Sequence, residues 1–124
     1  MPDMPGLNII VAGTEGARFC AALETAIAAA ALGQRARLFL QGDAAAMLRA
    51  PAGLAGDGAR RAAGLPGLGE LIDEALASEV EIIVCQSGLA LSDLTADRIV
   101  GGVKAGGVVS FLAAIAPEDR LIVY

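Results

Sequence analysis

Cys85 ends an apolar run at residues 80–84, and it is the one side chain with intrinsic nucleophilic power near neutral pH among the loops that follow the predicted strands. Gln86, Ser87 and Gly88 follow it and lead into a helical turn that we expect from Leu89 to Leu94. A thiol that faces the backbone N–H groups at a helix start is stabilised as the thiolate, which lowers its pKa from about 8.5. The pattern predicts a reactive thiol at Cys85, with Ser87 as an additional hydrogen-bond donor.

A purely structural role for Cys85 stays open, because a cysteine that ends an apolar strand is often a small core side chain. The sequence contains no histidine, so activation would come from the backbone, from Arg18 or from a neighbouring chain. An acidic side chain close to the thiol, such as Glu15 or Asp43, would oppose activation. Cys20 lies on the apolar face of a predicted helix, and we expect it to serve packing.

Two further glycine-containing loops follow predicted strands. Ligands and reactive groups of open parallel α/β sheets gather at the carboxyl ends of the strands, so these loops are expected to share one edge with Cys85. We expect the following residues to support or bind there: Gly13, Thr14, Glu15, Gly42, Asp43, Gln86, Ser87 and Gly88. Thr14 is predicted to cap the first helix, and anion binding at that helix start is the alternative.

Apolar runs without alternation predict strands that are covered on both faces. The expected strands are Leu7–Ala12, Arg35–Leu40, Val80–Cys85 and Arg120–Tyr124. Helical periodicity predicts helices over Ala17–Leu32, Leu68–Ser78 and Gly107–Ala116. This alternation predicts a single α/β domain over residues 1–124: a three-layer α/β/α sandwich with a mostly parallel sheet of about five strands.

Two stretches give weak patterns. Residues 50–67 lack periodicity, so we expect a mobile loop that could move over Cys85; a broken helix from Ala59 to Gly64 is the alternative. A short fifth strand is expected around Gly102 and Val103, where glycines interrupt the apolar pattern.

The composition excludes several classes of protein. The net charge is −5, with one tyrosine and no tryptophan, which argues against a nucleic-acid surface. The longest apolar stretch, Thr25 to Leu32, is far shorter than the roughly 18 residues of a membrane span. The start, Met1 to Asp3, has no basic stretch before an apolar core, so we expect no signal peptide and a cytoplasmic location.

Established site motifs are missing from the sequence. Neither G-x-G-x-x-G nor the phosphate-binding G-x-x-x-x-G-K-[ST] occurs, and the serine-hydrolase pattern G-x-S-x-G is also lacking. The cysteines and carboxylates have no spacing that is usual for a metal site. We therefore expect neither a metal nor a cofactor.

The order of these elements resembles the DsrE/DsrF-like family, which includes TusD-type sulfur relay proteins. Five features carry the resemblance over nearly the whole chain: the opening strand, the alanine-rich helix closed by Gly33, the segment Leu38–Asp43, the strand ending in Cys85, and Gly106-Gly107 before the last helix and strand. The resemblance implies five parallel strands, assembly into trimers or hexamers of one chain or of paralogous chains, and a persulfide carried on Cys85.

The leading hypothesis is a sulfur carrier or sulfurtransferase with donor and acceptor proteins as partners. A non-catalytic oligomer subunit or adaptor, with a merely structural Cys85, is the alternative from another class. A small-ligand module with its pocket at the same edge is the third. Hydrophobic residues make up 56% of the chain before glycine is counted, against about 45–50% with glycine in ordinary domains, so we expect self-association.

Overall fold

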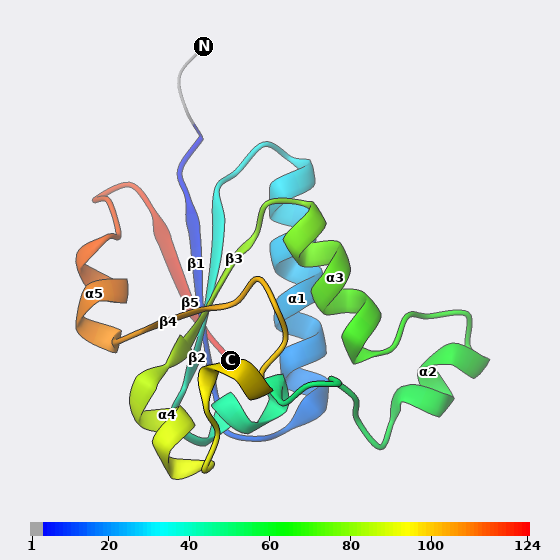
Figure 1. The fold of residues 1–124 in the computed structure, drawn as a ribbon. Helices are drawn as coiled ribbons and strands as arrows, with labels where there is room; N and C mark the ends of the chain where they lie inside the picture. The colour runs from blue at the N-terminus through cyan, green and yellow to red at the C-terminus, as the bar shows by residue number, and fades with distance from the viewer. Residues whose placement is uncertain (1–3) are drawn as a thin grey trace.

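The computed structural model describes residues 4–124 and has three layers, with a parallel sheet between two layers of helices (Figure 1). The expectation about a signal peptide rests on the first three residues, which lie outside the described part. The five strands are β1 (Leu7–Ala12), β2 (Ala36–Gln41), β3 (Glu81–Cys85), β4 (Lys104–Gly106) and β5 (Arg120–Val123). The predicted α/β class and three-layer architecture are confirmed, and every strand pair is parallel.

The sheet has the order β4-β3-β2-β1-β5. The helical segments are α1 (Gly16–Ala31), the 3-10 helix η1 (Gly42–Leu48), α2 (Asp57–Ala62), α3 (Leu68–Ala77), α4 (Gln86–Leu91), the 3-10 helix η2 (Ala96–Arg98) and α5 (Val108–Ala113). Helices α1 and α3 cover one face of the sheet and α5 covers the other, while η1 and α4 lie at its carboxyl edge (Figure 1).

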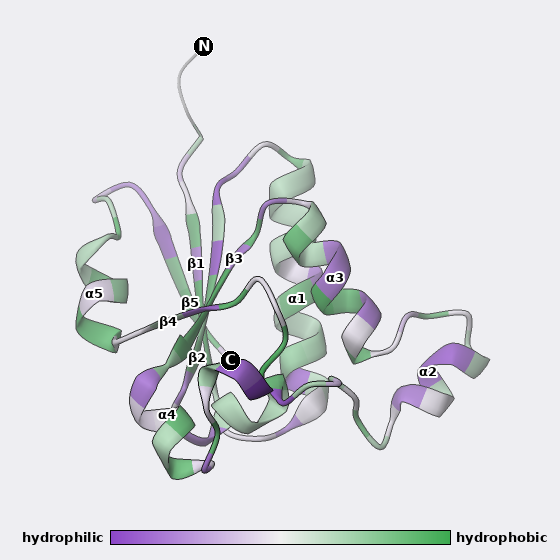
Figure 2. Cartoon of the chain, viewed as in Figure 1, coloured by the Kyte–Doolittle hydropathy of each residue, from purple (hydrophilic) through white to green (hydrophobic). Residues whose placement is uncertain are grey.

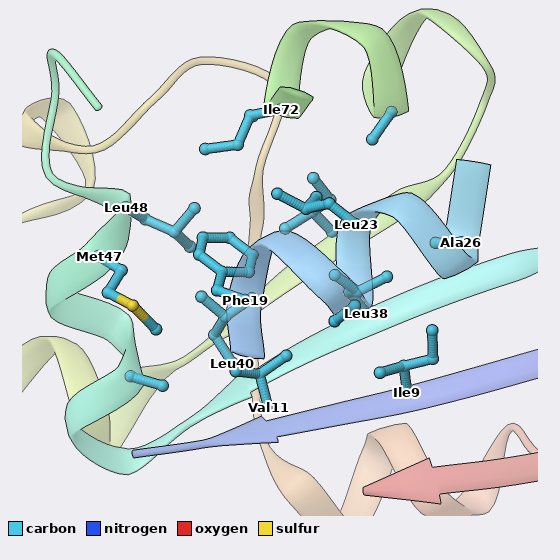
Figure 3. Packing of buried hydrophobic residues seen from close by; sticks show 14 of the residues in the cluster. Ile9, Val11, Phe19, Leu23, Ala26, Leu38, Leu40, Met47, Leu48 and Ile72 are labelled. Carbon is cyan, nitrogen blue, oxygen red and sulfur yellow. The ribbon is translucent and has the colours of Figure 1, made fainter. Parts of the chain in front are cut away.

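The larger core lies between the sheet and α1, α3 and η1. Phe19 and Leu23 of α1 pack there with Leu38 and Leu40 of β2 and with Ile72 of α3 (Figure 3). Even-numbered positions of β2 face this core because side chains alternate along a strand. Burial of these side chains is the main force that fixes the layers, at roughly 25 cal/mol per Å² of apolar area.

A smaller core lies on the α5 face of the sheet. It consists of Ile10, Phe39, Ile83, Cys85 and Phe111, and the rings of Phe39 and Phe111 are stacked 5.1 Å apart. Figure 2 shows α5 mainly in hydrophobic colours. The Cys85 side chain therefore belongs to the face opposite to α1.

Two weakly patterned stretches differ from expectation. The fifth strand exists, but β4 begins at Lys104, after the predicted Gly102 and Val103. Residues 50–67 include α2, which overlaps the alternative helix from Ala59 and begins two residues earlier. Asp57 stabilises this start, since its carboxylate accepts hydrogen bonds from the backbone N–H groups of Leu54 and Leu68, both at 3.0 Å.

Within residues 4–124, no helix is both long and apolar enough to cross a membrane. In the same part of the chain, no group of three or more histidine, cysteine, aspartate and glutamate side chains is arranged to hold a metal ion.

Candidate functional site

Cys85 is the last residue of β3 and directly precedes α4. Its backbone is extended, with φ −65° and ψ 123°, and the chain then turns into the helix at Gln86. The helical turn expected from Leu89 thus begins three residues earlier. Because Gln86 to Gly88 form the first turn of α4, their N–H groups have no partner within the helix and remain free to face the thiol.

Gly42 and Gly88 bring the loop after β2 against the start of α4. A Cβ atom on Gly88 would lie 2.1 Å from the carbonyl oxygen of Gly42 and 2.9 Å from the Cβ of Ala45. Gly42 itself has φ +60°, a left-handed conformation that favours glycine. A side chain at Gly88 would therefore require a shift, whereas at Gly42 only the positive φ disfavours one, since nothing lies within 4 Å of its Cβ position. The close approach of the two residues places the Gly42 N–H group beside the Cys85 sulfur.

The environment of Cys85 favours the thiolate. The residue is 8% exposed, and burial alone raises the pKa of its thiol. The backbone N–H groups of Gly42, Gly88 and Ser87, with the Ser87 hydroxyl, outweigh burial and hold the pKa below its usual value. Of the sources of activation considered above, the backbone therefore accounts for the shift, and Ser87 adds the expected donor.

Arg18 and Glu15 form an exposed ion pair with each other, with a distance of 2.9 Å between Nε and Oε2. Neither side chain is among the largest influences on the pKa of Cys85. Asp43 is exposed in the first turn of η1 and is not among them either. The opposing effect that we considered for nearby carboxylates is therefore not a main determinant of this pKa.

The structure does not bring all predicted edge residues together. Thr14 lines a cavity of about 430 Å³ on the α1 face, together with Cys20, Leu54 and Arg60. Gly13 and Glu15 flank Thr14 in the same loop after β1, two strands from β3. The residue that precedes α1 as its cap is Glu15, and no side chain caps this helix, so the prediction for Thr14 is wrong.

Segment 50–67 also belongs to the α1 side. Leu54 packs so closely on α1 that a Cβ atom on Gly16 would lie 2.6 Å from one of its methyl carbons. The segment therefore lies beside Cys20. The expectation that it could cover Cys85 is not met in this structure. The mobility of the segment stays a prediction.

Cys20 is buried in the middle of α1, with 2% of its surface exposed. Burial raises the pKa of its thiol; Arg60 lowers it, and Glu24 and Asp57 raise it further. Cys20 packs in the larger core, as expected, and both cysteines are free thiols.

The sequence analysis did not identify the apolar side chains that pack around Cys85 on the α5 face. Phe111 packs in the same cluster as Cys85, and Val108 and Ile115 pack against that cluster. These three residues have the spacing i, i+3, i+7 that marks one helix face, which was a usable signal.

The fold and this site define a class: a parallel α/β protein with one buried cysteine of lowered pKa at the carboxyl edge of its sheet. The family model of the DsrE/DsrF-like family matches residues 9–124, and the chain belongs to that family. No curated protein gives a significant sequence match.

Two solved structures share the fold over 98% of this chain and 100% of their own chains. The crystal structure of the ychN protein from E. coli superimposes with a TM-score of 0.73 at 20% sequence identity. A protein of unknown function from Methanobacterium thermoautotrophicum, MTH1491, superimposes with a TM-score of 0.74 at 14% identity.

Proposed function

We propose that this protein is a cytoplasmic sulfur carrier in which Cys85 holds sulfane sulfur as a persulfide and passes it to an acceptor thiol. Membership of the DsrE/DsrF-like family supports sulfur relay at the level of the family. The observation that carries the proposal for this chain is the position of Cys85, the last residue of β3, directly before the first turn of α4 and beside the loop at Gly42. Three backbone N–H groups and the Ser87 hydroxyl there favour the thiolate and lower the pKa of Cys85.

The transfer proceeds in two displacement steps without net oxidation. The Cys85 thiolate attacks the outer sulfur of a donor persulfide R–S–SH; the bond between the two donor sulfurs breaks, and R–S⁻ leaves as Cys85–S–SH forms. An acceptor thiolate then attacks the outer sulfur of this persulfide. That step forms the acceptor persulfide and returns Cys85 to the thiolate.

The hydrogen-bond donors around Cys85 suit its thiolate in both steps of this cycle. The N–H groups of Gly42, Ser87 and Gly88 stabilise the thiolate that attacks and the thiolate that leaves in the second step. Gln86 and Ser87 are exposed beside the buried sulfur, so we assign them to the entrance. Asp43 follows Gly42 directly in the chain and is exposed in the first turn of η1.

The proposal is tested with thiosulfate as sulfur donor and dithiothreitol as acceptor, with release of sulfide as the measurement. Wild type and Cys20→Ser should release sulfide at similar rates, because Cys20 lies in the larger core. Cys85→Ser should release none above background. Equal release by Cys85→Ser and wild type would contradict the proposal.

We also propose that the chain assembles with further copies of itself or with paralogous subunits. Leu121 and Val123 of β5 lie on the α5 face, since Val123 pairs with Ile10. They are 45% and 63% exposed because the six-residue helix α5 leaves β5 uncovered. An exposed apolar edge strand favours pairing with another chain.

Light scattering of the purified chain tests this assembly. Wild type should have the mass of a trimer or hexamer, and Val123→Lys should shift it toward the monomer. Leu65→Lys replaces another exposed apolar residue, far from β5 in the sequence, and should not change the mass. A monomeric wild type at micromolar concentration would contradict assembly of the chain with copies of itself. If it assembles but Cys85 carries no sulfur, the role as a non-catalytic subunit becomes the better account.

A further inference from the structure

Arg37 is a buried cation whose two hydrogen-bond acceptors are both uncharged. It is 4% exposed, and its Nε donates to Asn8 Oδ1 at 2.8 Å while its Nη2 donates to the carbonyl oxygen of Phe111 at 2.9 Å. The guanidinium carbon lies 4.2 Å from the centre of the Phe111 ring. Within residues 4–124, Arg37 forms no ion pair with a carboxylate.

A buried charge without a counter-ion lowers stability, because neutral hydrogen-bond partners only partly replace its hydration. The two hydrogen bonds also explain part of the role of Arg37, since one links β2 to Asn8 of β1 and the other holds Phe111 of α5 on the sheet. They leave Nη1 without a hydrogen-bond acceptor among residues 4–124, although this atom is not itself fully buried. The Nη1 group of the guanidinium thus remains available to a ligand.

A cavity of about 250 Å³ lies against Arg37 on the α5 face. Its polar lining includes Glu81, Lys104 and Ser110 in addition to Arg37. The Nζ atom of Lys104 is 3.9 Å from Glu81 Oε1, so one carboxylate faces two cations. The lining therefore carries an excess of one positive charge.

The strand register extends this cavity toward Cys85. Arg37 pairs with Glu81, Ile83 pairs with Lys104, and Cys85 pairs with Gly106. These positions share one face of the sheet, because side chains alternate along strands. Ile83 and Gly106 line the cavity, which therefore ends beside the position of Cys85 without including it.

We propose that this cavity binds a small molecule with an oxyanion group, which Arg37 and Lys104 hold by charge and to which the Ser110 hydroxyl donates. The cavity has the volume of roughly eight water molecules, which suits a small organic carboxylate or a tetrahedral oxyanion better than a halide. The binding does not use the Cys85 thiol, so this site is independent of the sulfur chemistry proposed above.

Calorimetric titration of the full chain with sulfate and, separately, with succinate tests the site at constant ionic strength set by chloride. Wild type should bind one of the two with saturation, and the one that binds identifies a tetrahedral oxyanion or a carboxylate. Lys104→Gln and Ser110→Ala should each weaken that binding by about tenfold, because a charge-assisted hydrogen bond is lost. Arg98→Gln replaces an exposed arginine on η2 as the matched control and should bind as wild type does.

Arg37→Gln should abolish binding, with folding checked by circular dichroism because this side chain also holds α5. Lys104 is 71% exposed, so its variant keeps the test valid if Arg37→Gln unfolds. Cys85→Ser should bind like wild type. Absence of saturable binding by wild type, unchanged binding by both Lys104→Gln and Ser110→Ala, or loss of binding in Cys85→Ser would overturn the proposal; none of these results depends on whether Cys85 accepts sulfur.

Discussion

Cys20 and Cys85 are both buried thiols, with 2% and 8% of their surfaces exposed, yet the pKa of the first is raised and that of the second is lowered. Cys20 lies inside α1, where the backbone N–H groups around it already bond within the helix. Its sulfur therefore experiences burial together with the carboxylates of Glu24 and Asp57, which Arg60 only partly offsets. Cys85 lies at a strand end, where the N–H groups of Gly42, Ser87 and Gly88 are free.

The comparison indicates that burial alone does not determine the pKa of a thiol in this molecule. Burial opposes ionisation at both positions, and the free N–H groups at the carboxyl edge of the sheet reverse its effect at only one. The lowered pKa of Cys85 therefore results from backbone N–H groups and the Ser87 hydroxyl, and no cationic side chain is among its main causes. Each experiment below changes one part of this difference.

The largest expected effect is in the alkylation of the folded protein. Near neutral pH, iodoacetamide should modify Cys85 at least about tenfold faster than Cys20, because the thiolate is the nucleophile and its fraction is larger at Cys85. Peptide mapping by mass spectrometry after short exposures measures both rates in the same sample. In urea the two rates should converge. Equal rates in the folded state would remove the distinction between the two cysteines.

Gly88→Ala should remove the close approach that places the Gly42 N–H group at the sulfur. Its Cβ would lie 2.1 Å from the Gly42 carbonyl oxygen, so the loop or α4 must shift. We expect a loss of about 1–3 kcal/mol in the free energy of unfolding, measured with urea, and slower alkylation of Cys85. The matched control is Gly58→Ala, since a Cβ on Gly58 of α2 meets nothing within 4 Å. A Gly88→Ala protein with wild-type stability and alkylation would contradict the role of this contact.

The two cysteines should make opposite contributions to the pH dependence of stability. The pKa of Cys85 is lower in the folded than in the unfolded chain, so its contribution is present above the ordinary thiol pKa of about 8.5 and is lost as the pH falls through the lowered value. The pKa of Cys20 is raised, so its contribution is present below the ordinary value and is lost as the pH rises through the raised one.

Urea unfolding between about pH 6 and pH 10 measures these contributions. The stability of wild type relative to Cys85→Ser should increase with pH, whereas that of wild type relative to Cys20→Ser should decrease. If the stability differences between wild type and each of the two variants changed with pH in the same direction, the two thiols would not have oppositely shifted pKa values.

Ser87→Ala should have the smallest effect, because it removes only the hydroxyl and leaves the Ser87 N–H group in place. The pKa of Cys85 should rise modestly, which the pH dependence of the ultraviolet absorbance of the thiolate measures in a Cys20→Ser background. Ser92→Ala, after the end of α4, is the matched control and should leave this pKa unchanged. If the pKa of Cys85 rose equally in Ser87→Ala and Ser92→Ala, the rise would not be specific to the loss of the Ser87 hydroxyl.

Continuous apolar runs made much of the fold predictable from the sequence. β1 matches its predicted limits, while β2 and β3 lie within one residue of theirs, because strands buried on both faces need unbroken hydrophobic stretches. Strand β4 was placed too early because three residues at a sheet edge, one of them glycine, carry no periodic signal. Helix α2 was not the main interpretation because its six residues show no periodicity; its start is stabilised by hydrogen bonds from the N–H groups of Leu54 and Leu68 to the Asp57 carboxylate.

The candidate site was predictable in part. The end of an apolar run identified Cys85, and the glycines after neighbouring strands identified Gly42 and Gly88. Side chains alternate between the two faces of a sheet, and the order of the strands cannot be predicted from the sequence alone. The sequence therefore did not predict that Thr14 lies on the α1 face while Cys85 lies on the α5 face. Arg37 was passed over although it interrupts the apolar run of β2; a charge in a strand expected to be buried on both faces was the available signal.

The most direct test of the central claim is the intact mass of the folded protein after incubation with polysulfide. Wild type, Cys20→Ser and Cys85→Ser are compared, each with and without subsequent reduction by dithiothreitol. We predict that wild type and Cys20→Ser gain the mass of one sulfur atom, which reduction removes, and that Cys85→Ser gains none. A gain in Cys85→Ser equal to that of wild type, or no gain in any of the three proteins, would contradict the assignment of Cys85 as the sulfur-carrying residue.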